Sequence, residues 1–508
     1  MAVKIVLLLV FFGIMVTVGI YSRRKATNVN DFVLGGRSVG PWVTAFAFGT
    51  SYFSSVVFVG YAGQFGWKYG LASTWIGLGN AFIGSLLAWV VLGRRTRVMS
   101  QQLESATMPD FFGKRYESKA LKLAASAIVF IFLIPYTASI YNGLSRLFAM
   151  AFDIPYAVCI ITMAVLTGVY VILGGYMATA INDFIQGIIM LIGIVLVIVA
   201  VLNGHGGFYE AVRQLAELES DVPVTLGQKG AFTSFFGPDV VNLFGVVVLT
   251  SLGTWGLPQM VHKFYAIKDE RAVKTGTVVS TIFAIIISGG CYFLGGFARL
   301  YADADIYKPD GSVMYDAIVP QMLSTLPDIL IGVVIVLVLS ASMSTLSSLV
   351  LTSSSTLTLD FIKGTIVKDM KEKNQLIVMR VLIAFFIIVS VVLALNPPTF
   401  IAQLMGISWG ALAGAFLAPF MYGLYSKKVT KAAVWAGFIV GVGLTVSNMF
   451  FKFIASPINA GAIAMVASLI IVPLVSLVTP KMKQESVDAM FSCYDQKVTV
   501  TEKTSLNE

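Results

Sequence analysis

Long apolar stretches recur along the whole chain. We mark about thirteen, from Val3 to the stretch that begins near Ala460, each close to the ~20 residues that a helix needs to cross the hydrocarbon core of a bilayer. The first is too long for a removable signal peptide. The pattern predicts an all-α polytopic membrane protein.

Basic residues fall in alternate connections between these stretches. Of the 35 Lys and Arg residues, 27 lie in segments 22–38, 93–122, 261–274, 361–380, 425–431 and 481–508. The positive-inside rule makes these segments cytoplasmic, with the N-terminus outside and the C-terminus inside. The net charge of +9 is then a consequence of topology, and we expect no nucleic-acid partner. Short loops favour a multi-pass protein of a bacterial inner (plasma) membrane.

Composition and motifs count against an enzyme. Cys159, Cys291 and Cys493 are scattered, and His205 and His262 stand alone in segments that we expect to be loops. The sequence has no phosphate-binding loop, no metal-ligand spacing, and no pairing of nucleophile and base. Uphill transport by this chain would have to be driven by an ion gradient rather than by ATP.

One stretch is unusually rich in hydroxyl groups. Of the nineteen residues from 340 to 358, twelve are Ser or Thr. At 100° per residue, Ala341, Ser344, Thr345 and Ser348 share a helix face, with Ser347 at its edge. Such hydroxyls often bond back to their own helix or allow close packing. Oxygen ligands without fixed charge also suit a hard cation such as Na⁺, and both interpretations stay open here.

A second polar interruption lies in the stretch 46–63. Gly49, Thr50, Ser51, Ser54 and Ser55 follow one another in otherwise apolar surroundings. Small polar residues at mid-depth predict a helix that is unwound there, with its freed carbonyl groups facing a cavity.

Several motifs resemble those of the sodium:solute symporters, over about residues 30–431. The matching segments are LGGRSVGPW at 34–42, Gly60 with Gly63, LGGYMATAINDFIQG at 173–187, GLPQMVHKFYAIKD at 256–269, SMSTLSS at 342–348 and WGALAGAFLAP at 409–419. The resemblance implies ten core helices in two inverted repeats of five. It divides the chain into 1–38 (a peripheral helix and cytoplasmic approach), 39–203 (first repeat), 204–239 (extracellular loop), 240–425 (second repeat), 426–480 (two peripheral helices) and 481–508 (a short cytoplasmic tail).

The same resemblance implies positions for sodium. One ion would be held by the carbonyl groups of Thr50, Phe53 and Ala341 and by the side chains of Ser344 and Thr345. Some members hold a second sodium, which here would use Asp183, Ser344, Ser347 and Ser348. Asp183 could equally be an acidic residue at the water-accessible end of a span. One sodium falling through ~100 mV and a tenfold gradient supplies about 3.7 kcal/mol, so one ion supports several hundredfold accumulation and two about 10⁵-fold.

The solute is expected beside the sodium site. Ser54 and Tyr136 match solute-contacting positions of proline carriers, but Thr250 stands where those carriers have a tryptophan. Trp255 follows five residues later, where an aromatic side chain more often packs than binds; Gln64 and Gln259 are further polar candidates. Arg146 and Arg299 could pair with an anionic solute or extend to the outer surface.

The sequence therefore predicts a Na⁺-coupled carrier of a small organic solute that works by alternating access. The solute would be an amino acid such as proline, or an organic acid such as pantothenate or sialic acid. Two alternatives remain: a proton-coupled carrier of the same fold that uses Asp183, and a transporter-like solute sensor. We expect Na⁺ as the coupling ion and the lipid bilayer as the surroundings, and the oligomeric state is left open, a monomer included.

Overall fold

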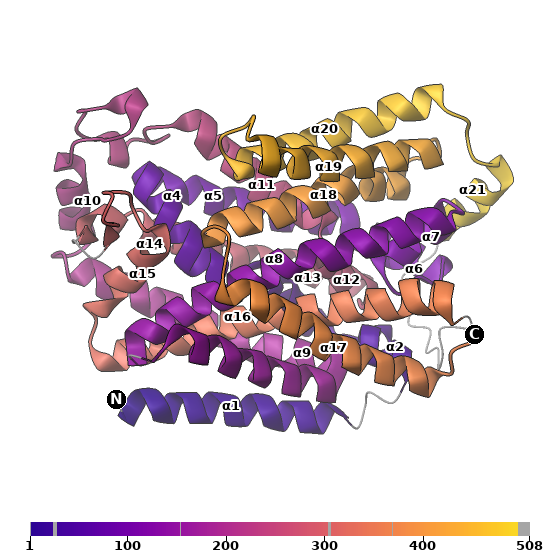
Figure 1. Cartoon of the computed structure of the whole chain (residues 1–508), viewed down its shortest axis with the longest axis horizontal. Coiled ribbons are helices and arrows are strands. Elements are labelled where there is room, and N and C mark those ends of the chain that lie inside the picture. The colour runs from indigo at the N-terminus through magenta and orange to yellow at the C-terminus, as the bar shows by residue number, and fades with distance from the viewer. Residues whose placement is uncertain (1, 24–27, 153, 303–305, 368, 496–508) are drawn as a thin grey trace.

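The computed structural model describes residues 2–23, 28–152, 154–302, 306–367 and 369–495, which form a bundle of long helices lying side by side (Figure 1). Among these residues, eleven helices are long and apolar enough to cross a membrane, or twelve if a pair bent by 45° counts as one span. The predicted all-α membrane fold is confirmed, and the count of thirteen spans and the division into repeats stay predictions.

The long helices run between the two ends of the bundle (Figure 1). They are α1 (Ala2–Arg23), α8 (Lys119–Phe152), α9 (Tyr156–Asn203), α13 (Glu270–Ala284), α16 (Asp328–Thr356), α17 (Glu372–Leu395), α18 (Ile401–Tyr425), α19 (Lys431–Phe451) and α20 (Pro457–Val478). The short helices α10 (Phe208–Glu217) and α15 (Tyr315–Ser324) lie at one end, and α7 (Met108–Arg115) and α21 (Gln484–Phe491) lie at the other (Figure 1).

Two helices are interrupted, as the sequence predicts. Helix α3 (Pro41–Tyr52) ends at Phe53, whose backbone is extended, and the chain becomes helical again through a π-helical segment (Val56–Tyr61) and α4 (Ala62–Tyr69). Helix α11 (Val240–Gly256) ends at Leu257, which is also extended, before α12 (Pro258–Tyr265). Because the last four carbonyl groups of a helix lack partners within it, each break exposes backbone oxygens inside the bundle.

Glycines bring helices into close contact near the first break. A Cβ atom at Gly66 of α4 would lie 1.8 Å from the carbonyl oxygen of Gly295, at the end of α14 (Gly290–Gly295). A Cβ atom at Gly441 of α19 would lie 2.1 Å from the backbone of α18. Small residues of this kind let helix backbones approach each other in membranes. The Gly66 contact holds α4, the second half of the first interrupted helix, against α14, and the Gly441 contact, elsewhere in the bundle, holds α19 against α18.

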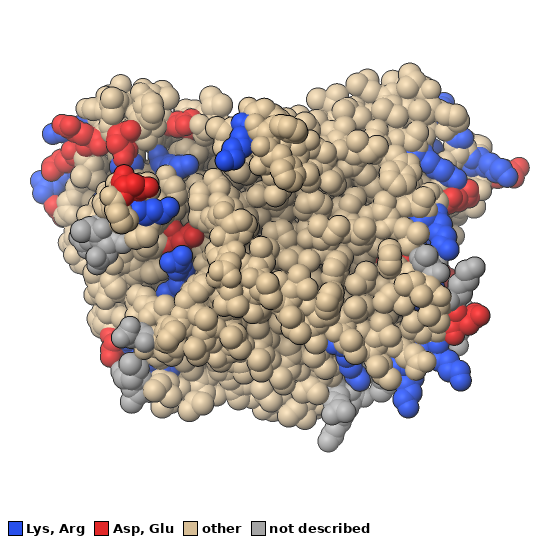
Figure 2. Space-filling view, viewed as in Figure 1, with Lys and Arg blue, Asp and Glu red and all other residues tan. Residues whose placement is uncertain are grey.

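On the face drawn in Figure 2, the charged residues are concentrated at the two ends of the bundle. Figure 2 shows a broad uncharged middle, with Lys and Arg gathered near α21 and mixed charges at the opposite end, near α10. An uncharged band flanked by charged ends is what a membrane-spanning bundle requires. The end rich in Lys and Arg is the one that the sequence predicts to be cytoplasmic.

Candidate functional site

The hydroxyl groups of α16 meet the end of α3. Ser344 Oγ lies 3.1 Å from the Thr50 carbonyl oxygen, and Thr345 Oγ1 lies 3.3 Å from the same oxygen and 3.5 Å from that of Ser51. Both hydroxyls also lie 3.1 Å from the Ala341 carbonyl oxygen. Four of the residues in these contacts belong to the predicted ligand set, and all four are buried: Thr50, Ala341, Ser344 and Thr345. The structure thus brings four of the five predicted sodium ligands together.

The fifth predicted ligand, Phe53, lies at the break itself. A small cavity of about 10 Å³ is lined by Phe53, Ser54 and Ala341, among other residues. The extended backbone of Phe53 leaves its carbonyl group outside any helix. No contact places that carbonyl oxygen on Ser344 or Thr345, so its role as a ligand stays a prediction, as does the sodium site as a whole.

The oxygens of this group suit a small cation. Ligands 2.3–2.6 Å from a hard cation are about 3.3–3.7 Å apart in an octahedral shell, close to the 3.1–3.5 Å separations observed here. Three carbonyl oxygens face only two hydroxyl hydrogens, and a hydroxyl keeps lone pairs when its hydrogen turns away. The donor set therefore fits Na⁺, although each hydroxyl also bonds back within its own helix.

Two of the four residues predicted for a second sodium, Asp183 and Ser348, contact a lysine. Lys263 Nζ, from α12, lies 3.3 Å from Asp183 Oδ2 and donates to Ser348 Oγ at 3.0 Å. Ser347 and Ser348 both donate to the Ser344 carbonyl oxygen, at 2.9 and 3.0 Å. Asp183 is fully buried, so it is not the water-exposed acidic residue of the alternative interpretation.

Lys263 is a functional candidate that the sequence reasoning missed. Segment 261–274 was expected to be a cytoplasmic loop, but Val261–Tyr265 belong to the buried helix α12. His262 accordingly lies in that helix and not in a loop, whereas His205 does lie in a turn. The only available signal was that Lys263 lies a few residues after the break in the second interrupted helix, where the chain bends by 45° and α12 continues inside the bundle.

Ser54 and Tyr136 lie where the solute was expected. The Ser54 hydroxyl accepts from the Val56 N–H at 3.2 Å. The Tyr136 hydroxyl makes no hydrogen bond of normal geometry in the described part of the chain, although the Ser54 hydroxyl and the Trp409 indole lie within reach of it. The Tyr136 ring packs edge-on against Trp409 of α18, with the centroids 5.9 Å apart. The Trp409 indole N–H also has no partner there. Trp409 is a second residue that the sequence reasoning missed, although a tryptophan in the middle of a span is unusual.

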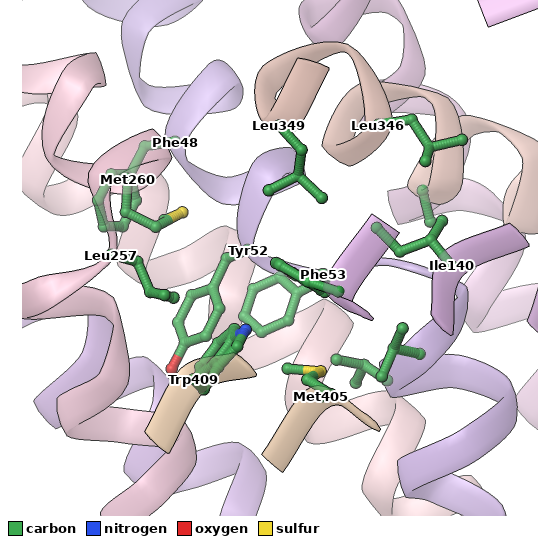
Figure 3. Close-up of a cluster of buried hydrophobic side chains, with 14 of the residues drawn as sticks. Phe48, Tyr52, Phe53, Ile140, Leu257, Met260, Leu346, Leu349, Met405 and Trp409 are labelled. Atoms are coloured by element: carbon green, nitrogen blue, oxygen red, sulfur yellow. The ribbon is translucent and has the colours of Figure 1, made fainter. Parts of the chain in front are cut away.

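Aromatic and aliphatic side chains surround the position, beside Ser54 and Tyr136, where the solute is expected. Tyr52 stacks on Phe53 with ring centroids 4.3 Å apart, and Trp409 lies next to Tyr52 at 6.1 Å. Figure 3 shows these three rings in the middle of an apolar cluster. The other labelled members are Phe48, Ile140, Leu257, Met260, Leu346, Leu349 and Met405.

Two of the three candidates on the second interrupted helix already have partners. The Thr250 hydroxyl donates to its own helix at Val246, and the Trp255 indole N–H donates to the Ile83 carbonyl oxygen at 3.0 Å. Both side-chain polar atoms of Gln259 are buried without a partner in the described residues. Trp255 thus has the packing role that the sequence suggested as the alternative, and Gln259 keeps free hydrogen-bonding groups.

A cavity of about 550 Å³ opens at the end of the bundle near α15. It reaches Gln64 and is lined by charged residues that include Lys68, Asp239 and Arg299. Arg299 donates to Asp221 at 2.6 Å and to the Trp67 carbonyl oxygen at 2.7 Å. It is therefore engaged within the protein, whereas Arg146 is exposed. We call this cavity the outer vestibule.

Polar contacts tie the opposite end together. Arg37, just before α3, donates to the Ser100 hydroxyl at 2.9 Å and to the Ser105 carbonyl oxygen at 2.7 Å. Burial lowers the pKa of Arg37 to about 10, so it keeps its charge at neutral pH. Lys122 bridges Asp110 at 2.6 Å and Asp360 at 3.2 Å. The described structure thus has its vestibule at one end and a cluster of hydrogen bonds and ion pairs at the other.

Comparison with known proteins identifies the family. The sodium:solute symporter family matches residues 32–441. The osmoregulated proline transporter OpuE of Bacillus subtilis is 28% identical over 445 residues, covering 87% of this chain and 88% of the relative. The sodium/proline symporter of Staphylococcus aureus (strain JH9) is 30% identical over 447 residues, covering 86% and 84%.

Solved structures confirm the fold. A Na⁺-coupled sialic acid symporter in a substrate-bound outward-open state aligns with a TM-score of 0.75 at 17% identity, covering 95% of this chain and 99% of that one. The nucleobase-cation-symport-1 transporter Mhp1 aligns with a TM-score of 0.52 at 14% identity, covering 91% and 98%. The chain belongs to the sodium:solute symporter family and is a multi-pass plasma-membrane transporter, not an enzyme, that couples Na⁺ to the uptake of a solute.

Proposed function

We propose that this protein takes up proline, or a closely related small amino acid, together with Na⁺. The two relatives described above are named for proline transport, and each aligns over more than four fifths of both chains. The contact between the Thr50 carbonyl oxygen and the hydroxyls of Ser344 and Thr345 carries the proposal. It provides a cation site directly beside the interrupted helix.

The apolar cluster favours a compact solute. None of the side chains labelled in Figure 3 carries a charge at neutral pH. A pyrrolidine ring suits such a lining, whereas a polyhydroxylated acid would leave many polar groups without partners. Tyr136 and Trp409 have donors that are unused in the described structure, and these donors would bind the solute carboxylate. Trp409 also supplies an indole ring, which is absent at Thr250, the position where proline carriers have a tryptophan.

Sodium binding would prepare the solute site. An ion held between α3 and α16 fixes the end of α3, and Ser54 follows that end by two residues. Sodium would therefore order the backbone at Ser54 before the solute arrives through the outer vestibule. Release to the cytoplasm would require the contacts between Arg37 and Ser100 and between Arg37 and Ser105 to open. This order of events is the alternating-access cycle that we propose for this chain.

Uptake into proteoliposomes tests the proposal. Purified protein is reconstituted, and uptake of radiolabelled proline is measured with an inward Na⁺ gradient, with Na⁺ equal on both sides, and with a proton gradient in choline buffer. We expect accumulation only with the Na⁺ gradient. Accumulation driven by protons alone would favour the proton-coupled alternative. No accumulation of proline under the inward Na⁺ gradient, with accumulation of labelled pantothenate or sialic acid under the same gradient, would reject proline as the solute.

A further inference from the structure

The ammonium group of Lys263 is buried in the middle of the polar region. Its side chain is 2% exposed, and the side chain of Asp183 is 1% exposed. A buried ammonium is costly unless it is paired and hydrogen-bonded. Lys263 meets that condition with the Asp183 carboxylate, the Ser348 hydroxyl and the face of the Tyr176 ring, whose centroid lies 5.3 Å from Nζ.

These partners come from two helices, and Lys263 itself comes from a third. Asp183 and Tyr176 lie on α9, Ser348 lies on α16, and Lys263 itself lies on α12. A monovalent cation bound at this position would contact the same groups as the ammonium does: the oxygens of Asp183 and Ser348 and the face of the Tyr176 ring. Asp183 and Ser348 are also two of the residues that the sequence assigned to a second sodium. The ammonium is therefore placed where that ion would have to bind.

A short chain of hydrogen bonds joins Lys263 to the first cation site. Ser348 Oγ, which accepts from Lys263, lies 2.9 Å from Ser51 Oγ. The carbonyl group of Ser51 is in turn 3.5 Å from the Thr345 hydroxyl. The ammonium is thus linked to the end of α3 through Ser348, one helical turn along α16 from Ser344 and Thr345. It can hold α3, α9 and α16 in one arrangement without any ion in the second position.

We propose that Lys263 replaces the second sodium as a permanent internal cation, so that this transporter moves one Na⁺ with each solute. The inference rests on the proposed function, because it assumes that the oxygens around Ser344 and Thr345 bind Na⁺. It assigns to Lys263 the part that a second ion would play, which is to neutralise Asp183 and to bridge α9 and α16. Removal of the ammonium then leaves a vacant second site.

Binding of radioactive ²²Na⁺ to the purified full-length protein tests this assignment. The wild-type chain is expected to bind one Na⁺, and the Ser344→Ala, Thr345→Ala double variant none. Lys263→Ala is expected to bind two, because Asp183 and Ser348 become available to an ion. Lys263→Arg, which keeps the charge, is expected to bind one. Adding Asp183→Asn to Lys263→Ala is expected to return the count to one.

The outcomes separate the two proposals. A wild-type chain that binds no Na⁺ refutes the proposed function. One that binds two refutes the role of Lys263 and leaves sodium coupling intact. A Lys263→Ala protein that is monodisperse and binds only one Na⁺ also refutes it. If that variant does not fold, the coupling ratio of the wild-type protein decides: the Na⁺ gradient that just balances a known solute gradient at zero voltage should equal the solute gradient for one ion, and its square root for two.

Discussion

The hydroxyl of Thr345 lies 3.3 Å from the carbonyl oxygen of Thr50, although 295 positions separate the two residues in the chain. The contact exists because α3 stops at Tyr52 and leaves its last carbonyl groups without partners inside the helix. A helix that continued through Phe53 and Ser54 would use the Thr50 oxygen itself. The interruption and the hydroxyl-rich helix are therefore two halves of one candidate site.

Replacing Ser344 and Thr345 together by alanine should abolish the stimulation of uptake by Na⁺, because both hydroxyl oxygens would leave the first site. Initial uptake rates at increasing Na⁺ concentration measure the effect. The matched control is the double variant Ser342→Ala, Ser354→Ala, whose hydroxyls bond only to Val338 and Leu351 in the same helix. Equal sodium stimulation in both double variants would contradict the site.

Tyr136→Phe should raise the KM for proline about tenfold or more and leave stability nearly unchanged. The hydroxyl that it removes makes no hydrogen bond of normal geometry in the described structure, and only the Ser54 hydroxyl and the Trp409 indole lie within reach of it. Little is therefore lost on folding, whereas a hydrogen bond to a charged solute group contributes about 1.5–3 kcal/mol. Tyr422→Phe is the control, because its hydroxyl donates to the Leu469 carbonyl oxygen at 3.0 Å. It should lower the melting temperature and not the apparent affinity for proline.

Trp255→Phe should lower stability and leave the KM for proline nearly unchanged, which is the reverse of the effect expected for Tyr136→Phe. Its indole N–H donates to the Ile83 carbonyl oxygen, and an orphaned buried acceptor costs about 1–3 kcal/mol. We expect a lower melting temperature in detergent with the KM for proline within about twofold of wild type. Trp409→Phe, which removes an unpartnered indole N–H, should instead weaken proline uptake. A large rise in the KM for proline in Trp255→Phe, and not in Trp409→Phe, would indicate that Trp255 contacts the solute.

The fold and the two separate elements of the candidate cation site could be predicted from local patterns. Apolar stretches of membrane length fix the helices, and the polar residues around Thr50 mark the break. The face formed by Ser344 and Thr345 follows from helical periodicity alone. Pairing that face with the α3 break came from the family resemblance, because no local pattern connects residues so far apart in the chain.

Lys263 and Trp409 could not be predicted in the same way. A lysine at the end of an apolar stretch satisfies the positive-inside rule, so its sequence context suggested a loop. Its burial depends on the extended residue Leu257, which turns α12 back toward α9 and α16. The unused indole N–H of Trp409 likewise depends on how α18 packs against Tyr52 and Tyr136. Both are consequences of tertiary packing.

Asp316 should make stability depend on pH near the outer vestibule. This carboxyl, on α15, accepts from the Ile401 N–H at the start of α18, while its other oxygen has no partner in the described residues. Burial raises its pKa to about 6 from an ordinary 3.8. Since the folded state prefers the protonated acid, stability should increase as the pH falls from about 6 to about 4, by on the order of 3 kcal/mol. Melting temperatures of the purified protein between pH 4 and 8 measure this. Asp316→Asn should be more stable than wild type at neutral pH and should lose this part of the pH dependence; an identical profile in the variant would show that other groups cause it.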